Sequence, residues 1–388
     1  MALKGKNMQY ERWLEKRKQL KSSYFLFGPR GTGKTHWIQN LHPKALYIDL
    51  LNSQTYRRLL NNPSSLRELI PAGFDDWIIL DEVQRVPELL NEVHSLIESK
   101  SYKFCMTGSS ARKLRAKGTN LLAGRAVVRK MHPLIAQELG KDFSLTHALK
   151  YGLLPETISH HDPEDYLSSY VSTYLKEEVT QEGVIRHLDA FSRALETASY
   201  SQGSILNVSA VARDAQVSRK AMEGYFTIME DLLLADKLPV FSKRAKRKLI
   251  SHSKFYFFDA GVFRTLRPMG PFDRPEEADG AALETLFYQH LRALNDYLHL
   301  GYTLYFWHTQ TQLEVDFVLY GKLGLRAFEI KRSRNIAPAD LNGLKAFGND
   351  YPEAKLYILY GGSCRLYFGN IEAIPFEEAL RELPSLLE

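Results

Sequence analysis

The feature that most constrains this chain is the loop sequence GPRGTGKT at positions 28–35, which directly follows the apolar run 24–27. Its pattern, G-x-x-x-x-G-K-T, is the phosphate-binding loop expected between a strand and a helix. Gly28, Gly31 and Gly33 carry no Cβ, so the backbone can turn successive N–H groups towards a polyphosphate. The helix that follows adds the partial positive charge of its N-terminus. The sequence therefore predicts a nucleoside-triphosphate site.

Two side chains of this loop have specific expected roles. Lys34 is expected to reach the β- and γ-phosphates, and the Thr35 hydroxyl is expected to ligate Mg²⁺. ATP and Mg²⁺ are therefore the expected cofactors. The nucleotide-binding set predicted from the sequence is Gly28, Pro29, Arg30, Gly31, Thr32, Gly33, Lys34, Thr35 and His36.

A second motif is the run DWIILDE at 76–82, an apolar segment that ends in two carboxylates. A parallel strand covered on both faces has this composition, and after a phosphate loop the pattern is typical of a Walker B strand. Asp81 is expected to hold Mg²⁺ through its hydration shell, and Glu82 to orient or deprotonate the attacking water. The alternative is that the two carboxylates only begin a helix.

Two further polar groups are candidates for the same site. Thr107 and Ser109 lie at the end of the strand predicted at 102–107, where a hydroxyl could contact the γ-phosphate or the water; otherwise Ser109 caps the next helix. Arg125 follows Gly124 in a turn before another strand. An arginine there could stabilise the transferred phosphoryl group in its own chain or in a neighbouring copy of a homo-oligomer. The alternative is a solvated surface arginine.

The segments GPRGTGKT, IILDEVQRVPELL, CMTGSSARKL, LLAGRA and MHPLIAQEL occur in this order. Together they resemble a family of prokaryotic AAA-type ATPases, in which an AAA-like module precedes a C-terminal region of unassigned function. That region has been likened to a restriction-endonuclease-like fold. The resemblance implies ATP binding, ATP hydrolysis and a prokaryotic cytoplasmic setting.

The chain has 388 residues, which is too long for one ordinary core. We expect an α/β protein: an AAA-like P-loop NTPase domain at 1–140, with a parallel sheet and helices on both faces. A helical and winged-helix-like domain at 141–270 and a PD-(D/E)xK nuclease-like α/β domain at 271–388 complete the prediction. No run approaches the ~20 apolar residues of a membrane span. The charged start of the chain argues against a signal peptide, so a cytoplasmic protein without a membrane partner is expected.

The middle of the chain contains a candidate DNA-binding segment. Residues 207–237 read as a helix-turn-helix, and residues 238–241 lead into the basic stretch SKRAKRK, of which 243–248 could form a wing. The net charge of +6 also favours an acidic partner. Acidic residues on the second helix weaken the case for insertion into a DNA groove. Contact with DNA and packing against protein therefore remain alternatives.

The last third carries an ionisable set: Glu284 on a predicted helix, and Asp316, Glu329 and Lys331 on predicted strands. Strand alternation places Glu329 and Lys331 on one face, beside Asp316 on a neighbouring strand. This order resembles the PD-(D/E)xK nuclease core, in which carboxylates bind Mg²⁺ or Mn²⁺ and a lysine positions a water. The proline of the motif is replaced by Val315. An active nuclease, and a fold that keeps these residues for structure or nucleic-acid binding, are both open.

Overall fold

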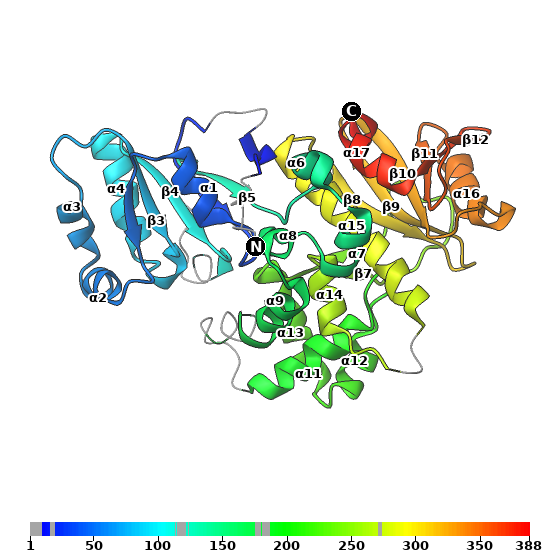
Figure 1. Cartoon of the computed structure of the whole chain (residues 1–388), viewed down its shortest axis with the longest axis horizontal. Coiled ribbons are helices and arrows are strands. Elements are labelled where there is room, and N and C mark those ends of the chain that lie inside the picture. The colour runs from blue at the N-terminus through cyan, green and yellow to red at the C-terminus, as the bar shows by residue number, and fades with distance from the viewer. Residues whose placement is uncertain are drawn as a thin grey trace, which may run out of the picture. The chain divides into compact units, whose positions relative to one another are not determined.

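The computed structural model describes residues 10–15, 20–112, 114, 122, 124–174, 180, 187–270 and 274–388 (Figure 1). The chain divides into two compact units. The first comprises Arg12–His132 together with Asp231–Leu234. The second comprises Met1–Glu11, Pro133–Glu230 and Ala235–Glu388.

The first unit is built on a five-stranded parallel sheet of order β2-β3-β4-β1-β5. Its strands are β1 (Tyr24–Phe27), β2 (Leu46–Asp49), β3 (Trp77–Asp81), β4 (Lys103–Gly108) and β5 (Val127–Lys130). Strand β1, which lies between β4 and β5, is buried at every position, as expected for a parallel strand between two helical layers. The predicted P-loop NTPase fold is confirmed.

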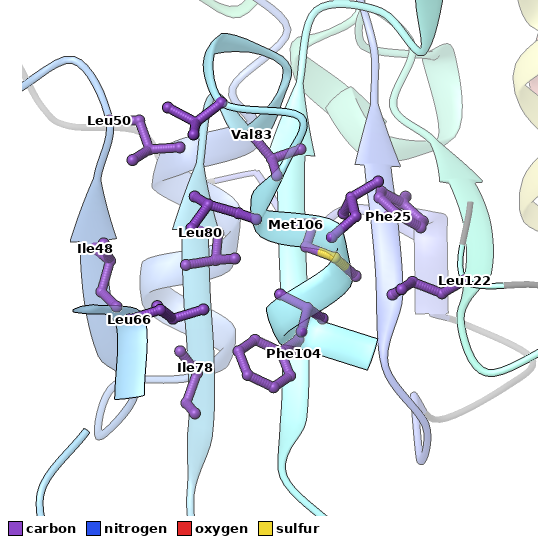
Figure 2. Close-up of a cluster of buried hydrophobic side chains, with 14 of the residues drawn as sticks. Phe25, Ile48, Leu50, Leu66, Ile78, Leu80, Val83, Phe104, Met106 and Leu122 are labelled. Atoms are coloured by element: carbon purple, nitrogen blue, oxygen red, sulfur yellow. The ribbon is translucent and has the colours of Figure 1, made fainter. Parts of the chain in front are cut away.

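Helices flank this sheet, among them α1 (Lys34–Leu41), α2 (Ser53–Asn61), α3 (Leu66–Leu69) and α4 (Leu89–Lys100). Short 3₁₀ turns lie at Trp13–Glu15, Pro63–Ser65 and Val83–Arg85. Figure 2 shows apolar side chains of neighbouring strands gathered into one cluster, including Phe25, Ile48, Leu80 and Met106. This core holds the strand tips, and hence the residues that follow them, in fixed register.

The second unit begins with helices. They are α6 (Ala136–Leu139), α7 (Leu145–Tyr151), α8 (Pro155–Ser159), α9 (Pro163–Ser169), α11 (Leu188–Ser199), α12 (Val208–Asp214), α13 (Arg219–Asp231) and α14 (Ala260–Leu266). A two-stranded antiparallel sheet joins β6 (Ala235–Leu238) to β7 (Lys254–Phe257). The predicted helix-turn-helix corresponds to α12 and α13, with Asn207 and Ser218 as side-chain caps.

Residues 238–241, which precede the basic stretch, lie only partly in a strand. Strand β6 ends at Leu238, because Pro239 has no N–H to continue the ladder. The chain then runs along the strand β8 (Thr303–His308): Phe306 donates its N–H to the Pro239 carbonyl at 3.0 Å, and Phe241 donates to the Phe306 carbonyl at 2.7 Å. The partner of β6 is β7, which the sequence analysis did not predict.

A buried carboxylate fastens two parts of this helical region together. Asp259 caps α14 by accepting the N–H groups of Gly261 and Val262 at 2.9 and 3.1 Å. Its other oxygen accepts the N–H of Leu153 at 2.8 Å, from the segment that follows α7. Gly152 is required beside it, since a Cβ there would lie 1.9 Å from an Asp259 oxygen. The beginning and the end of the helical region therefore meet at one side chain.

The rest of the second unit is a mixed six-stranded sheet of order β12-β13-β11-β10-β9-β8. Its remaining strands are β9 (Glu314–Gly321), β10 (Gly324–Lys331), β11 (Lys355–Tyr360), β12 (Leu366–Phe368) and β13 (Ile371–Pro375). The long helix α15 (Pro275–Tyr297), α16 (Asn342–Asp350) and α17 (Phe376–Leu387) accompany it (Figure 1). In the described part of the chain, no helix is both long and apolar enough to cross a membrane.

Candidate functional site

The phosphate loop turns between β1 and α1 on glycines. Gly31 and Gly33 have φ angles of 81° and 87°, a region that a Cβ disfavours. Gly28 is needed because of a close approach, since a Cβ there would lie 2.3 Å from the Met131 carbonyl oxygen. The Thr32 hydroxyl donates to the Pro29 carbonyl at 2.9 Å and closes the loop on itself.

Lys34 lies within this loop and is buried. Its ammonium donates to the carbonyls of Gly28 at 2.7 Å and Pro29 at 3.1 Å. Arg12, which the sequence analysis missed, donates to the Thr32 carbonyl at 2.8 Å and to the His132 carbonyl at 2.6 Å. The guanidinium therefore ties the loop to the segment that follows β5. Nothing in the local sequence around Arg12 signals this role.

The other predicted loop residues lie at the surface of this region. Arg30 is half-buried, whereas Thr35 and His36 are exposed at the start of α1. An exposed first turn leaves the hydroxyl of Thr35 within reach of solvent, which a residue that meets a bound nucleotide requires.

Asp81, at the tip of β3, accepts hydrogen bonds from three hydroxyl groups. Thr35 donates to Oδ2 at 3.2 Å, Tyr47 donates to the same oxygen, and Thr107 donates to Oδ1. Asp81 is only 5% exposed. Burial, together with the bond to Asp81, raises the pKa of Tyr47, so its phenol keeps its proton. A hydroxyl and a carboxylate side by side are oxygen ligands of the type that Mg²⁺ prefers, and the pair fits that ion.

Glu82 follows with an unusual backbone conformation. Its φ of 62° is left-handed, which is uncommon for a residue with a Cβ. Its N–H donates to the Thr107 hydroxyl at 3.2 Å. The side-chain amide of Gln84 donates to Glu82 Oε2 at 2.5 Å and to the Ser109 hydroxyl at 3.2 Å. Gln84, which the sequence analysis missed, thus links the two residues predicted to handle the water.

Arg125 lies elsewhere in the first unit. It precedes β5, which runs parallel to β1. Arg125 therefore lies at the N-terminal end of these strands, whereas the phosphate loop follows the C-terminal end of β1. Its guanidinium pairs with the carboxylate of Glu98 near the end of α4. The structure therefore does not bring Arg125 to the phosphate loop of its own chain.

The C-terminal ionisable set is gathered in the second unit. Asp316 on β9 and Glu329 on β10 are buried, and the Lys331 ammonium pairs with Glu329 Oε1 at 2.7 Å. Asp316 accepts the Ile330 N–H at 2.9 Å. Glu284 on α15 accepts from the Tyr256 hydroxyl at 2.7 Å. The strand alternation expected from the sequence brings these side chains onto adjacent elements.

A lysine that the sequence analysis missed lies among these carboxylates. Lys254 on β7 is 3% exposed. Its ammonium is 2.6 Å from Glu314, 2.9 Å from Asp316 and 3.5 Å from Glu284. Burial alone would lower the pKa of this ammonium, but Asp316 and Glu284 raise it well above its usual value. Burial also raises the pKa of Glu284, to about 7. Across the described residues, no group of three or more His, Cys, Asp or Glu side chains could hold a metal ion.

The basic stretch predicted at 243–248 lies in the exposed loop between β6 and β7. Two of its cations have partners in the same unit: Arg247 pairs with Asp350 at 2.6 Å, and Lys243 lies over the Tyr320 ring at 4.9 Å. On α13, the guanidinium of Arg219 pairs with Glu223 at 2.9 Å. Part of this positive charge is therefore already used within the protein.

Comparison with known proteins divides the chain into three successive matches. Residues 21–140 match the model of an AAA domain. Residues 142–273 match a domain of unknown function (DUF8612), and residues 279–379 match another (DUF4143). The chain therefore combines an AAA-type P-loop domain with a C-terminal α/β region.

Three curated relatives carry no assigned function. Uncharacterized proteins of Mycobacterium bovis and Mycobacterium tuberculosis are each 26% identical over 368 residues, which cover 92% of this chain and 80% of the relative. An uncharacterized protein of Haemophilus influenzae is 22% identical over 51% of this chain and 54% of its own length. The solved structure of the Aeropyrum pernix ORC1 protein in complex with DNA matches 64% of this chain and 87% of that chain. That match has 13% identity and a TM-score of 0.25.

Proposed function

We propose that the AAA-type domain of this chain binds ATP with Mg²⁺ and hydrolyses it, and that the nucleotide state controls the C-terminal half. The observation that carries the proposal is the meeting of Thr35 and Asp81, 3.2 Å apart, beside a glycine loop that contains a buried lysine. A loop of this sequence in a strand–loop–helix setting is suited to a polyphosphate.

Each polar group of the site has a proposed task. The Lys34 ammonium, which now donates to loop carbonyls, binds the β- and γ-phosphate oxygens instead. Thr35 and Asp81 hold Mg²⁺, which supplies positive charge beside the phosphates when it is bound. Glu82 orients a water in line with the γ-phosphorus and accepts its proton as the bond to the ADP oxygen breaks. Gln84 and Ser109 position Glu82, and Thr107 holds the turn at Asp81.

An ATP-turnover assay with Glu82→Gln tests this proposal. The variant is expected to bind ATP with Mg²⁺ as the wild type does, and to hydrolyse it at least about a hundredfold more slowly, because the amide cannot accept the water proton. Equal turnover in the two proteins would remove Glu82 from the mechanism. Tight ATP binding by the wild type without measurable turnover would instead identify the protein as a nucleotide switch.

We further propose duplex DNA as a partner of the C-terminal half, with domain boundaries near residues 140 and 270. The supporting observation is the exposed loop between β6 and β7, in which Arg244, Lys246 and Lys248 are exposed and form no ion pair with another described residue. Together with α12 and α13, this loop suits a winged-helix arrangement. An arginine acting in trans, such as Arg125, would require a homo-oligomer.

A DNA titration followed by fluorescence anisotropy tests the partner. Changing Arg244, Lys246 and Lys248 to alanine is expected to weaken binding and to reduce the slope of log affinity against log salt by up to about three. Changing Arg247 to alanine is the matched control, since that guanidinium is already paired with Asp350. If the wild type binds no DNA, the loop serves a protein contact or none.

ATP-gated DNA cleavage is the alternative function, and the gathering of Asp316, Glu329 and Lys331 supports a nuclease-like fold for the C-terminal region. Incubation of the protein with labelled DNA and Mn²⁺, with and without ATP, tests cleavage. Cleavage that disappears in Asp316→Ala would support it. The position of Lys254 among the same carboxylates argues against it.

A further inference from the structure

The carboxylates of the C-terminal cluster have few oxygens left for a metal ion. Asp316 accepts a hydrogen bond from the Lys254 ammonium at Oδ1 and one from the Ile330 N–H at Oδ2. Glu329 accepts a hydrogen bond from the Lys331 ammonium at Oε1 and one from the Asp316 N–H, at 3.3 Å, at Oε2. Each of these four oxygens already accepts a hydrogen bond from a nitrogen, whereas a divalent cation is bound by several oxygens that converge on it. In the described part of the chain, these carboxylates do not form a group of three or more that could hold a metal ion.

The Lys254 ammonium lies between the groups that would have to converge. It approaches Asp316 from β9, Glu284 from α15 and Glu314 from the start of β9, each within 3.5 Å. The Phe306 ring centroid lies 5.7 Å from the same nitrogen. A buried ammonium without such partners would be very costly, so its position depends on these carboxylates.

We infer that Lys254 is the resident cation of this carboxylate cluster, and that it takes the place that a divalent metal would need. The comparison with metal nucleases depends on the proposed fold of the C-terminal region. The occupation of the cluster by Lys254 depends neither on that fold nor on ATP hydrolysis by the first unit.

The inference also gives the cluster a structural task. Lys254 belongs to β7, which pairs with β6 in the small sheet that follows the two helices α12 and α13. Its partners belong to α15 and β9 of the C-terminal region. The cluster therefore fastens the small sheet to β9 through two ion pairs and to α15 through a third, in addition to the backbone contacts of residues 239–241 with β8.

Titration of the full-length protein with Mn²⁺ in the absence of nucleotide, followed by electron paramagnetic resonance, tests this inference. The wild type is expected to bind no Mn²⁺ at this cluster. Asp316→Asn should therefore leave its Mn²⁺ signal unchanged. Lys254→Met replaces the ammonium with an apolar side chain of similar length and leaves the carboxylates uncompensated. This variant is expected to gain a Mn²⁺ site with affinity at least about tenfold above that of the wild type, and Lys254→Met with Asp316→Asn is expected to lose it.

Thermal unfolding gives a second readout. Lys254→Met is expected to lower Tm by about 10 °C without metal, because carboxylates are left buried and unpaired, and to recover part of that loss in Mn²⁺. Lys237→Met is the matched control on β6, since its ammonium pairs with Glu230 outside the cluster. Should Lys254→Met fail to fold, the wild type still decides: a Mn²⁺ ion lost on Asp316→Asn would overturn the inference. An unchanged Tm and no new Mn²⁺ site in Lys254→Met would also overturn it.

Discussion

The Thr35 hydroxyl lies 3.2 Å from the Asp81 carboxylate, although the two residues are 46 positions apart in the chain. Thr35 follows β1 and Asp81 ends β3, and β4 lies between those strands in the sheet. The two residues meet because the carboxyl ends of parallel strands share one edge, where ligands of open α/β sheets bind. The contact therefore depends on the strand order as much as on the two motifs.

Lys34→Ala is expected to abolish measurable ATP binding, because the ammonium is the only side-chain cation of the loop that the motif directs to the β- and γ-phosphates. Isothermal titration calorimetry with ATP and Mg²⁺ measures the effect. Lys44→Ala, at an exposed lysine near the end of α1, is the control and should bind normally. Retained heat of binding in Lys34→Ala would argue against a phosphate role for this lysine.

Thr107→Val is expected to lower the free energy of unfolding by about 1–3 kcal/mol, because a shape-matched methyl leaves a buried Asp81 oxygen and the Glu82 N–H without their shared hydroxyl. Urea unfolding measures this. Thr107→Ser keeps the hydroxyl and should restore most of the loss. An unchanged free energy of unfolding in Thr107→Val would show that these hydrogen bonds do not set the stability.

Gln84→Ala is expected to lower kcat for ATP hydrolysis by about tenfold and to leave KM within about twofold, since Gln84 orients Glu82 without a phosphate contact. Steady-state kinetics separate the two parameters. Ser109→Ala removes only the second bond of the same amide and should have the smaller effect. A larger change in KM than in kcat would show that Gln84 acts on nucleotide binding.

His290 makes the stability of the second unit depend on pH. Its Nε2 accepts the Ala136 N–H at 2.9 Å, while Nδ1 lies 2.7 Å from the Leu286 carbonyl, so the neutral ring satisfies both groups. Burial lowers the pKa of this imidazole to about 4. As the pH falls, the unfolded chain therefore binds a proton at this histidine before the folded protein does. The stability that the neutral ring contributes is fully present above pH 6.5 and is lost as the pH falls towards 4.

Once the pH is below the pKa of the folded protein, the His290 effect lowers the free energy of unfolding by about 3 kcal/mol. His290→Gln keeps an acceptor for Ala136 but cannot be protonated, so its urea midpoint should fall less than that of the wild type between pH 7 and pH 4.5. His161→Gln, at an exposed histidine, should leave the wild-type slope unchanged. Parallel profiles for the wild type and His290→Gln would exclude His290 as the source.

The sequence predicts the first unit well because its signals are local. The glycines, Lys34 and Thr35 lie in one short loop, and the carboxylates of the Walker B strand follow a continuous apolar run. Their neighbours were harder to predict. Tyr47 and Gln84 reach the site only through the order of the strands, and nothing around them in the sequence differs from ordinary strand or turn composition.

Lys254 shows the same limit in the second unit. Its partner Asp316 is 62 positions away, and the sequence around the lysine, KFYF, gives no sign of a buried charge. Asp316 and Glu329 were named because their positions follow a strand pattern, whereas the cation that pairs with Asp316 comes from a strand that the sequence analysis did not predict. For Arg125 the alternatives stayed open for a related reason, since a Gly-Arg turn does not reveal at which end of the strands it lies.

The carboxylate of Asp259 joins residues 106 positions apart, at the N–H of Leu153. The same carboxylate therefore serves both ends of the helical region at once. A change at Asp259 would release the N-terminal cap of α14 and the segment after α7 together.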